Sequence, residues 1–383
     1  MIGSDEHHSR WAWAEVDLGA ITHNVGQLRT AVAPADVWAV VKADGYGHGA
    51  VQVGRASLTA GAAGLCVAFV SEGVVLRRAG IDAPILVLSE QPVETFGDLI
   101  AHDLIATVST AEGVDRLAAA VVDTGGATCR VHLKVDTGMH RVGARPDEVA
   151  SLVARIDEHP QALVLDGVFT HLAVADEVSN PYTQDQLDRF DAALRSASTA
   201  DTVAVHAANS AAALTRPDAR RSLVRAGIAV YGVSPGPELD EHTAWLRPAM
   251  ALKARVAHVK RLNAGDRLSY GLRHVLAADS TVATVPIGYA DGVRRNLSGT
   301  GATVLIGGAR REIIGTITMD QLMVDCGDDT VAVGDEVVLI GQQGEAEIRA
   351  EDWAATLGTI GYEIVCGIGP RVPRRYVSGA WSP

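Results

Sequence analysis

Eight short apolar runs alternate with helical segments over the first two thirds of the chain, and this alternation limits the possible folds most. Alanine-rich segments with apolar residues at helical spacing separate the runs, among them 51–60, 114–122, 148–156 and 184–197. A parallel (β/α)8 TIM-type barrel typically needs about 250 residues. A doubly wound open sheet is the alternative, but eight strands favour the barrel. The runs are 37–43, 65–70, 85–89, 104–108, 130–136, 164–171, 203–207 and 223–233.

After Pro248 the pattern changes to short β-branched segments that Gly, Asp and Asn turns separate. Gly307-Gly308 between two of these segments is a hairpin signal. The sequence therefore predicts an α/β chain with a barrel over residues 13–248 and a C-terminal all-β domain over 249–383. Residues 1–12 form an N-terminal segment, and the apolar stretch 11–16 is suited to add a strand to the β domain.

Composition and charge exclude several classes of function. The 383 residues are 48% hydrophobic and carry a formal charge of −13, which argues against nucleic acid or an anionic membrane as a partner. No segment is long and apolar enough to span a membrane, and the N-terminus lacks the apolar core of a signal peptide. Four scattered cysteines show neither metal-ligand nor redox spacing. We expect a cytoplasmic protein with reduced cysteines and no metal.

Lys42 interrupts an apolar run in the stretch AVVKADGYGHG, residues 39–49. An unpaired ammonium in a low-dielectric interior loses several kcal/mol of solvation, in order of magnitude. Desolvation also favours the neutral, nucleophilic amine that covalent catalysis needs. A salt-bridged or snorkelling lysine at a strand end is the alternative, and these residues alone leave both interpretations open.

Polar side chains recur where the predicted barrel strands end, and functional groups of such barrels lie at those ends. A lone histidine there is more often structural, but several cationic and amide groups directed to one mouth indicate a site. Asn209-Ser210, at a predicted helix start, and Gly227 also suit an anion, because phosphate usually binds after strands seven and eight. Taken singly, Ser210 would be an ordinary N-cap. The strand-end residues are Lys42, Lys134, Asp136, His171, Asn209, Ser210, Arg225, Gly227 and Ile228.

The stretch around Lys42 resembles the pyridoxal phosphate lysine motif of alanine racemases. Further matches to that family are LSYG around Tyr270, PIGYADG around Tyr289, and TMDQ around Met319 and Asp320, so the resemblance covers nearly the whole chain. It implies that Lys42 forms the Schiff base with pyridoxal 5'-phosphate. The same resemblance implies the other residues of the cofactor site: Tyr46, His171, Asn209, Ser210, Arg225, Gly227 and Ile228.

The resemblance also implies a racemase that interconverts L- and D-alanine with two bases. Lys42 would act on one face of the substrate and Tyr270 on the other, supported by His171 linked to Arg225. Tyrosine, with a pKa near 10, needs such neighbouring positive charge to act as a base. Arg225 would face the pyridine nitrogen, where a permanent cation discourages protonation.

The substrate side of the site is also implied. Arg141 would orient the substrate carboxylate with Lys134 beside it. In some members of the family that lysine carries a carbamate, whose charge would pair with Arg141. The β domain of a second subunit closes the site in this family, so a homodimer would share its sites. The residues that act across subunits would be Tyr270, Tyr289, Met319 and Asp320.

Two departures from the family pattern bear on the substrate. Thr318 stands where many members have cysteine, and Pro370 stands where a phosphate-contacting tyrosine is common. Proline has neither a hydroxyl nor an N–H, so that contact is lost. The expected role is supply of D-alanine for peptidoglycan. The alternatives are a racemase of serine or another amino acid, a fold-related decarboxylase and a non-catalytic pyridoxal phosphate carrier; the last two fit Arg225 and Tyr270 poorly.

Overall fold

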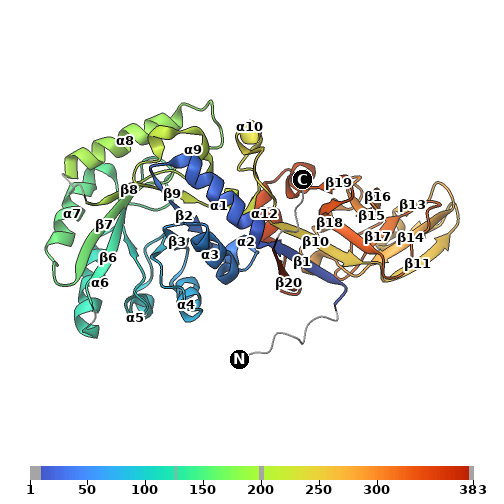
Figure 1. Cartoon of the computed structure of the whole chain (residues 1–383), viewed down its shortest axis with the longest axis horizontal. Coiled ribbons are helices and arrows are strands. Elements are labelled where there is room, and N and C mark those ends of the chain that lie inside the picture. Colours follow the sequence, from blue (N-terminus) through green and yellow to red (C-terminus); the bar gives the residue numbers. More distant parts are fainter. Residues whose placement is uncertain (1–9, 126, 198–201, 379–383) are drawn as a thin grey trace. The chain divides into compact units, whose positions relative to one another are not determined.

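The computed structural model describes residues 10–125, 127–197 and 202–378. The chain forms two compact units, and Figure 1 colours them in sequence order. One unit comprises Ile21–Leu246. The other comprises Arg247–Pro383 together with the start of the chain up to Ala20.

The first unit is a barrel of parallel strands. Two sheets, β4-β3-β2-β9 and β5-β6-β7-β8, make up its wall. The Leu86–Ile105 bridge joins β4 to β5, and Ser222 N donates to Val205 O between β8 and β9 (3.0 Å). The closed (β/α)8 barrel predicted from the sequence is thereby confirmed. Its strands are β2 (Asp36–Val40), β3 (Gly64–Val67), β4 (Ile85–Val87), β5 (Ala106–Val108), β6 (Cys129–Lys134), β7 (Leu163–Phe169), β8 (Ala204–His206) and β9 (Leu223–Ala226).

Helices form the outer layer of this unit in Figure 1. Helix α6, for example, buries Val114, Leu117 and Val121, which recur at helical spacing, and the Thr110 side chain accepts from Gly113 N at its start. The helices are α1 (Leu18–Val32), α2 (Lys42–Tyr46), α3 (Ala50–Thr59), α4 (Val70–Arg78), α5 (Phe96–Ala101), α6 (Ala111–Thr124), α7 (Val149–Asp157), α8 (Tyr182–Ala197), α9 (Ser210–Thr215) and α10 (Asp240–Thr243).

The second unit is built mainly of antiparallel strands, as predicted, in the order β11-β14-β17-β16-β15-β18-β10-β1-β20, with β19 on β18. Gly307 and Gly308 turn the β15–β16 hairpin with φ of 62° and 78°. The elements are β10 (Met250–Arg255), β11 (His258–Leu262), β12 (Arg267–Leu268), β13 (His274–Val275), β14 (Ser280–Val285), β15 (Thr303–Ile306), β16 (Ala309–Ile314), β17 (Leu322–Asp325), β18 (Glu336–Gln343), β19 (Ala346–Ile348), β20 (Arg374–Val377), α11 (Ala350–Leu357) and α12 (Gly361–Cys366).

The N-terminal boundary differs from the predicted one at residue 13. Strand β1 (Ala12–Asp17) pairs antiparallel with β10 and parallel with β20, so it belongs to the β unit. A boundary at residue 13 would divide this strand between the two units, although its backbone hydrogen bonds all lie within the β unit. Residues 1–9 of the predicted N-terminal segment lie outside the described residues.

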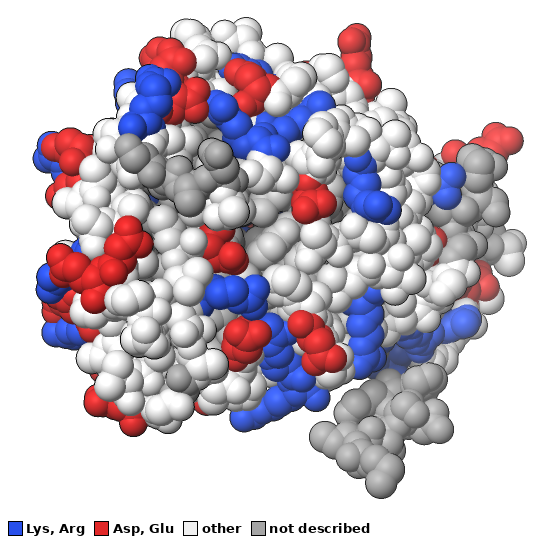
Figure 2. Space-filling view, turned by 60° about the vertical axis from the view of Figure 1, so that its left-hand side comes forward, with Lys and Arg blue, Asp and Glu red and all other residues white. Residues whose placement is uncertain are grey.

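The predicted eighth run, residues 223–233, is also shorter as a strand than expected. Strand β9 ends at Ala226, and a 3₁₀ turn (Ile228–Tyr231) follows Gly227. Lysine, arginine, aspartate and glutamate side chains lie interspersed over the face drawn in Figure 2. In the described part of the chain, no helix is both long and apolar enough to cross a membrane.

Candidate active site

Lys42 follows β2 after one residue, Val41, and stands at the start of a turn that runs in the left-handed sense. Residues 43–46 have φ between 51° and 61°. A non-glycine residue in this conformation costs roughly 1–2 kcal/mol, so the surrounding structure must hold the turn. The turn brings the Tyr46 ring into the barrel, where it packs 4.8 Å from the ring of Tyr231.

Five predicted cofactor residues gather at the ends of β8 and β9. The Asn209 side chain caps α9 by accepting from Ala212 N, and the next residue, Ser210, accepts at Oγ from Gly227 N (2.8 Å) and Ala229 N (3.3 Å). A Cβ on Gly227 would lie only 2.6 Å from the hydroxyl of Tyr46, so that hydroxyl lies against the glycine backbone. Ile228 begins the 3₁₀ turn.

This cluster is a cradle of hydrogen-bond donors. Two backbone N–H groups after β9 donate to Ser210 Oγ, so the proton of that hydroxyl points to another acceptor, and the Tyr46 hydroxyl lies against the same glycine, Gly227. Donors with no opposing carboxylate suit a phosphate group.

Arg225 lies in β9 with 4% of its surface exposed. Its Nη2 donates to the carbonyl of Thr170 at 2.7 Å and lies 3.3 Å from Nδ1 of His171. Its guanidinium also lies 5.1 Å from the centre of the Phe169 ring. Burial lowers the pKa of Arg225 to about 10, which still leaves a cation at neutral pH. The predicted link between Arg225 and His171 is present in this geometry.

Lys134 ends β6 inside the barrel. Its Nζ donates to Leu88 O at 3.1 Å and lies 5.4 Å from the centre of the Phe169 ring. Burial, reinforced by the positive charge of Arg225 and then of Arg141, lowers the pKa of Lys134 to about 8. Part of its population is therefore a neutral amine near pH 8.

A short loop after β6 carries Arg141. Asp136 shapes this loop, because its Oδ1 accepts from Gly138 N and His140 N, each at 3.0 Å. The side chain of Arg141 is exposed, and its charge still reaches Lys134 and His171.

His171 contacts Arg225 and lies in the electrostatic field of three further cations of the barrel. Its pKa lies well below the ordinary value, first because of burial and then because of four positive charges. The histidine is therefore neutral at physiological pH. The four charges, in order of their effect, are those of Arg225, Arg141, Lys134 and Lys42. The barrel mouth suits a ligand that carries both a phosphate and a carboxylate.

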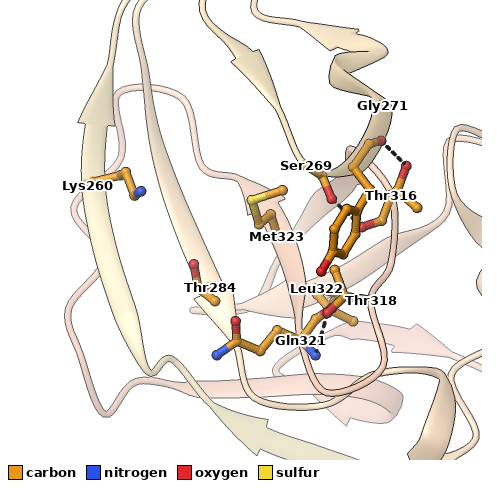
Figure 3. A pocket seen from close by; sticks show the side chains of 10 residues that line it. Lys260, Ser269, Gly271, Thr284, Thr316, Thr318, Gln321, Leu322 and Met323 are labelled. Carbon is orange, nitrogen blue, oxygen red and sulfur yellow. Dashed lines mark hydrogen bonds between the residues drawn. The ribbon is translucent and has the colours of Figure 1, made fainter.

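The remaining predicted residues lie in the β unit. Tyr270 stands in a strained loop between β12 and β13, with φ of 60° at Ser269 and 49° at Leu272. Its carbonyl accepts from Thr316 Oγ1, and Ser269 Oγ donates to Thr316 O (Figure 3). The buried side chains of Leu268, Leu276, Val282 and Ile314 pack beneath the hairpin. The Tyr270 side chain itself is 73% exposed and lines a pocket of about 550 Å³.

Tyr289 and Met319 lie on two neighbouring loops of the same unit. Backbone hydrogen bonds join these loops, from Tyr289 N to Thr318 O (3.0 Å) and from Ala290 N to Met319 O (3.1 Å). A Cβ on Gly288 would lie 2.3 Å from Thr318 O, so only glycine permits this approach. A pocket of about 450 Å³ between the loops is lined by Tyr270, Tyr289, Met319 and Asp320, among others.

Sequence reasoning missed two histidines that contact the site. His206 Nδ1 accepts from Arg225, and His206 Nε2 lies 2.8 Å from His132 Nδ1. Both rings are almost completely buried. His132 lies in the middle of an apolar run and not at its end, so the strand-end criterion passed over it. A histidine inside an apolar run was the available signal.

Comparison with known proteins places the chain in a family. Residues 16–235 match the family model described as alanine racemase, N-terminal domain, and residues 249–376 match alanine racemase, C-terminal domain. Over 379 residues the chain is 48% identical to an alanine racemase of Symbiobacterium thermophilum, which covers 96% of this chain and 97% of that protein.

Solved structures agree. An alanine racemase from Streptomyces lavendulae superposes with a TM-score of 0.91 and 42% identity, covering 97% of this chain and 98% of that one. A histidine racemase from Leuconostoc mesenteroides superposes with a TM-score of 0.89 and 28% identity, covering 97% and 100%. Both units of the chain are thus matched, in sequence and in structure, and the chain belongs to the alanine racemase family of isomerases.

Proposed function

We propose that this protein interconverts L- and D-alanine with pyridoxal 5'-phosphate as cofactor and with Lys42 and Tyr270 as the two bases. The observation that carries the proposal is the pair of buried cations inside the barrel: Arg225 and Lys134 both lie over the Phe169 ring, and Arg225 also lies 3.3 Å from His171. The hydroxyls of Ser210 and Tyr46 at Gly227 add donors for a phosphate. These groups match the two anionic ends of a phosphorylated cofactor that holds an amino acid.

The residues present fit this cofactor. The hydroxyls of Ser210 and Tyr46, beside Gly227, would hold its phosphate, and Lys42 would bind it covalently. When bound, pyridoxal phosphate supplies the electron sink that makes the Cα–H of an amino acid acidic. The protein then has to hold the substrate and move a proton.

Arg225 would face the pyridine nitrogen. It is a buried donor that stays charged at neutral pH, so it withholds a proton from that nitrogen. A decarboxylase needs a strong electron sink and a carboxylate at this position, which Arg225 does not provide. Arg141 would orient the substrate carboxylate, and Lys134, whose pKa the charge of Arg141 helps to lower, would lie beside it as an amine or as a carbamate.

Two bases on opposite faces account for inversion at Cα. Lys42 in the barrel would hold or release the proton on one face. Tyr270 of the partner subunit would do so on the other, with Tyr289, Met319 and Asp320 beside it. The proposal therefore includes a homodimer with shared sites. The exposure of the Tyr270 side chain supports it, because a catalytic tyrosine buried in its own unit could not serve a partner.

A racemase of serine or another amino acid is the second candidate. Pro370 in place of a tyrosine favours a wider pocket, and the solved histidine racemase has the same fold. The biological role that we propose is supply of D-alanine for peptidoglycan from a cytoplasmic enzyme.

The test is a racemisation assay with pyridoxal phosphate present. Each enantiomer of alanine, serine and histidine is incubated with the purified protein, and the enantiomers are separated by chiral chromatography. We expect alanine to have the highest kcat/KM, with conversion from either enantiomer to an equal mixture. Preferred racemisation of another amino acid would support the second candidate, and no racemisation of any amino acid would contradict both.

A further inference from the structure

Hydrogen bonds on both sides hold the turn that carries Lys42 and Tyr46. On its C-terminal side, Asp44 accepts from Ala50 N at Oδ1 (2.9 Å) and from Gly49 N at its carbonyl (2.8 Å). Within the turn, Gly45 N donates to Val41 O (2.8 Å) and Gly47 N donates to Ala43 O (3.0 Å). These bonds close a left-handed coil, but they leave the N–H of Ala43 directed away from them. Three non-glycine residues with positive φ make the coil costly, so an acceptor at the Ala43 N–H helps to stabilise it.

Glu72 provides this acceptor from a different element. Its Oε1 accepts from Ala43 N at 2.7 Å, although the two residues are 29 positions apart in the chain. Its Oε2 accepts from Ala68 N at 2.7 Å and from Phe69 N at 3.2 Å, at the start of α4. One carboxylate therefore fastens the start of a barrel helix to the residue that follows Lys42.

The geometry of Glu72 suits this double task. Its side chain is partly buried at the first turn of α4, where a carboxylate is also stabilised by the helix dipole. Hydrogen bonds from backbone N–H groups to a charged carboxylate are about twice as strong as neutral ones. A single oxygen could satisfy the helix start, so the second oxygen is available for the turn.

We propose that Glu72 is a positioning residue for Lys42: it holds the left-handed turn 43–46 in the one conformation that presents Lys42 and Tyr46 to the same ligand. The proposal rests on the proposed function for the identity of that ligand. The ordering of the turn by Glu72 is independent of the proposed function, because it is a property of the protein alone.

Loss of Glu72 should populate other conformations of the turn. Only the fraction of molecules with an ordered turn binds cofactor, so the apparent dissociation constant rises by the inverse of that fraction. A lost charge-assisted hydrogen bond corresponds to a rise of about 10- to 100-fold. The rate at which Lys42 links to added cofactor should fall by a similar factor, because the amine is no longer presented in one place.

The experiment compares Glu72→Gln with Glu148→Gln. Glu148 is a matched control, because it also accepts from a backbone N–H at a helix start, that of Arg145 at 3.0 Å, but it contacts no residue of the proposed site. A glutamine cannot accept on both sides, so Glu72→Gln must lose either the helix contact or the turn contact. Glu72→Asp keeps the charge and the helix contact but is too short to reach both, and it serves if the glutamine variant fails to fold.

Two measurements decide the matter. The first is hydrogen exchange of the peptide covering residues 42–50 in cofactor-free protein. The second is titration of that protein with pyridoxal phosphate, followed by absorbance. We expect faster exchange in this peptide and a 10- to 100-fold higher dissociation constant in Glu72→Gln and Glu72→Asp, with neither change in Glu148→Gln.

The outcomes separate this proposal from the proposed function. Unchanged hydrogen exchange in residues 42–50 of both Glu72 variants would overturn the positioning role. Equal changes in Glu148→Gln would also overturn it, because Glu72 would then act only as a helix cap. If no variant and no parent protein bound pyridoxal phosphate, the proposed function would fail. Hydrogen exchange in residues 42–50 would still test the positioning role of Glu72, because that measurement needs no cofactor.

Discussion

Arg225 donates from Nη1 to Nδ1 of His206 across 2.7 Å, and this contact fixes the protons of a chain of buried rings. An arginine can only donate, so Nδ1 of His206 is the acceptor and its proton lies on Nε2. That proton is donated to Nδ1 of His132, 2.8 Å away, so His132 carries its own proton on Nε2, which lies 3.5 Å from Asp166 Oδ2. The neutral ring of His206, itself hydrogen-bonded to His132, therefore fixes the position of the Arg225 guanidinium.

This arrangement predicts a loss of stability in mild acid. Burial lowers the pKa of His132, His171 and His206 in the folded barrel. As the pH falls below about 6.5, the unfolded chain takes up protons that the folded barrel refuses. The free energy of unfolding should therefore fall toward pH 5, by up to about 1.4 kcal/mol per pH unit for each histidine.

Denaturant unfolding between pH 7.5 and 5 measures this slope. His132→Gln should make the dependence of the unfolding free energy on pH less steep, because one of the three buried histidines is removed. His258→Gln, at an exposed position of β11, should not change this slope. An equal slope in His132→Gln and the parent protein would mean that His132 does not stay neutral.

Tyr270→Phe should lower racemisation by roughly 10²–10⁴-fold, because the ring stays and the proton acceptor is lost. In deuterated water, Cα exchange of the enantiomer handled by Lys42 should survive better than racemisation. Chiral chromatography and proton NMR measure the two rates. Small and equal losses in both directions would argue against Tyr270 as a base.

Subunit mixing tests whether Tyr270 acts across a dimer. Lys42→Ala and Tyr270→Phe are each expected to be inactive, yet a mixed dimer would contain one site with both native residues. Mixing them should restore part of the activity, with each variant mixed with itself as the control. Absence of recovery, once subunit exchange is demonstrated, would place both residues in one subunit.

Asp291 is a fully buried carboxylate in the β unit, paired with Arg10 at 2.6 Å and with Arg371 at 3.3 Å. Removal of one partner from a buried pair costs about 3–5 kcal/mol. Asp291→Ala should therefore destabilise the β unit by about that amount in denaturant unfolding. Asp328→Ala, which breaks an exposed pair with Arg261, should cost less than about 1 kcal/mol. Similar losses in the two variants would contradict this account.

Pro370→Tyr should narrow the substrate range. The loop of Pro370 lies against the Tyr289 turn, because Gly369 N donates to Asp291 O at 2.9 Å. A tyrosine there would fill space and supply a phosphate donor worth about 0.5–1.5 kcal/mol. The kcat/KM of serine relative to alanine should fall and cofactor affinity should rise. If both stay unchanged, another residue closes the pocket.

The barrel was predictable because its strands are continuous apolar runs and its helices keep their spacing. Arg225 and Lys134 were predictable as strand-end cations. The turn at 43–46 was predictable only in part: Asp44-Gly45 is a turn signal, but Ala43 and Tyr46 give no local signal for positive φ, and the contact of Ala43 N with Glu72 joins residues 29 positions apart. The pairing of the stretch 11–16 with the β domain was predicted, but the end of that strand at Asp17 was not, because its partners lie more than 200 residues away in the chain and set its length.

The most direct test of the central claim is to locate the cofactor on the chain. The holoenzyme is treated with borohydride, which reduces the carbon–nitrogen double bond between a lysine and pyridoxal phosphate, and the labelled peptide is then sequenced by mass spectrometry. The account predicts one label, on Lys42, and none in Lys42→Ala. A label on Lys134, whose pKa near 8 makes it the competing amine, would contradict it.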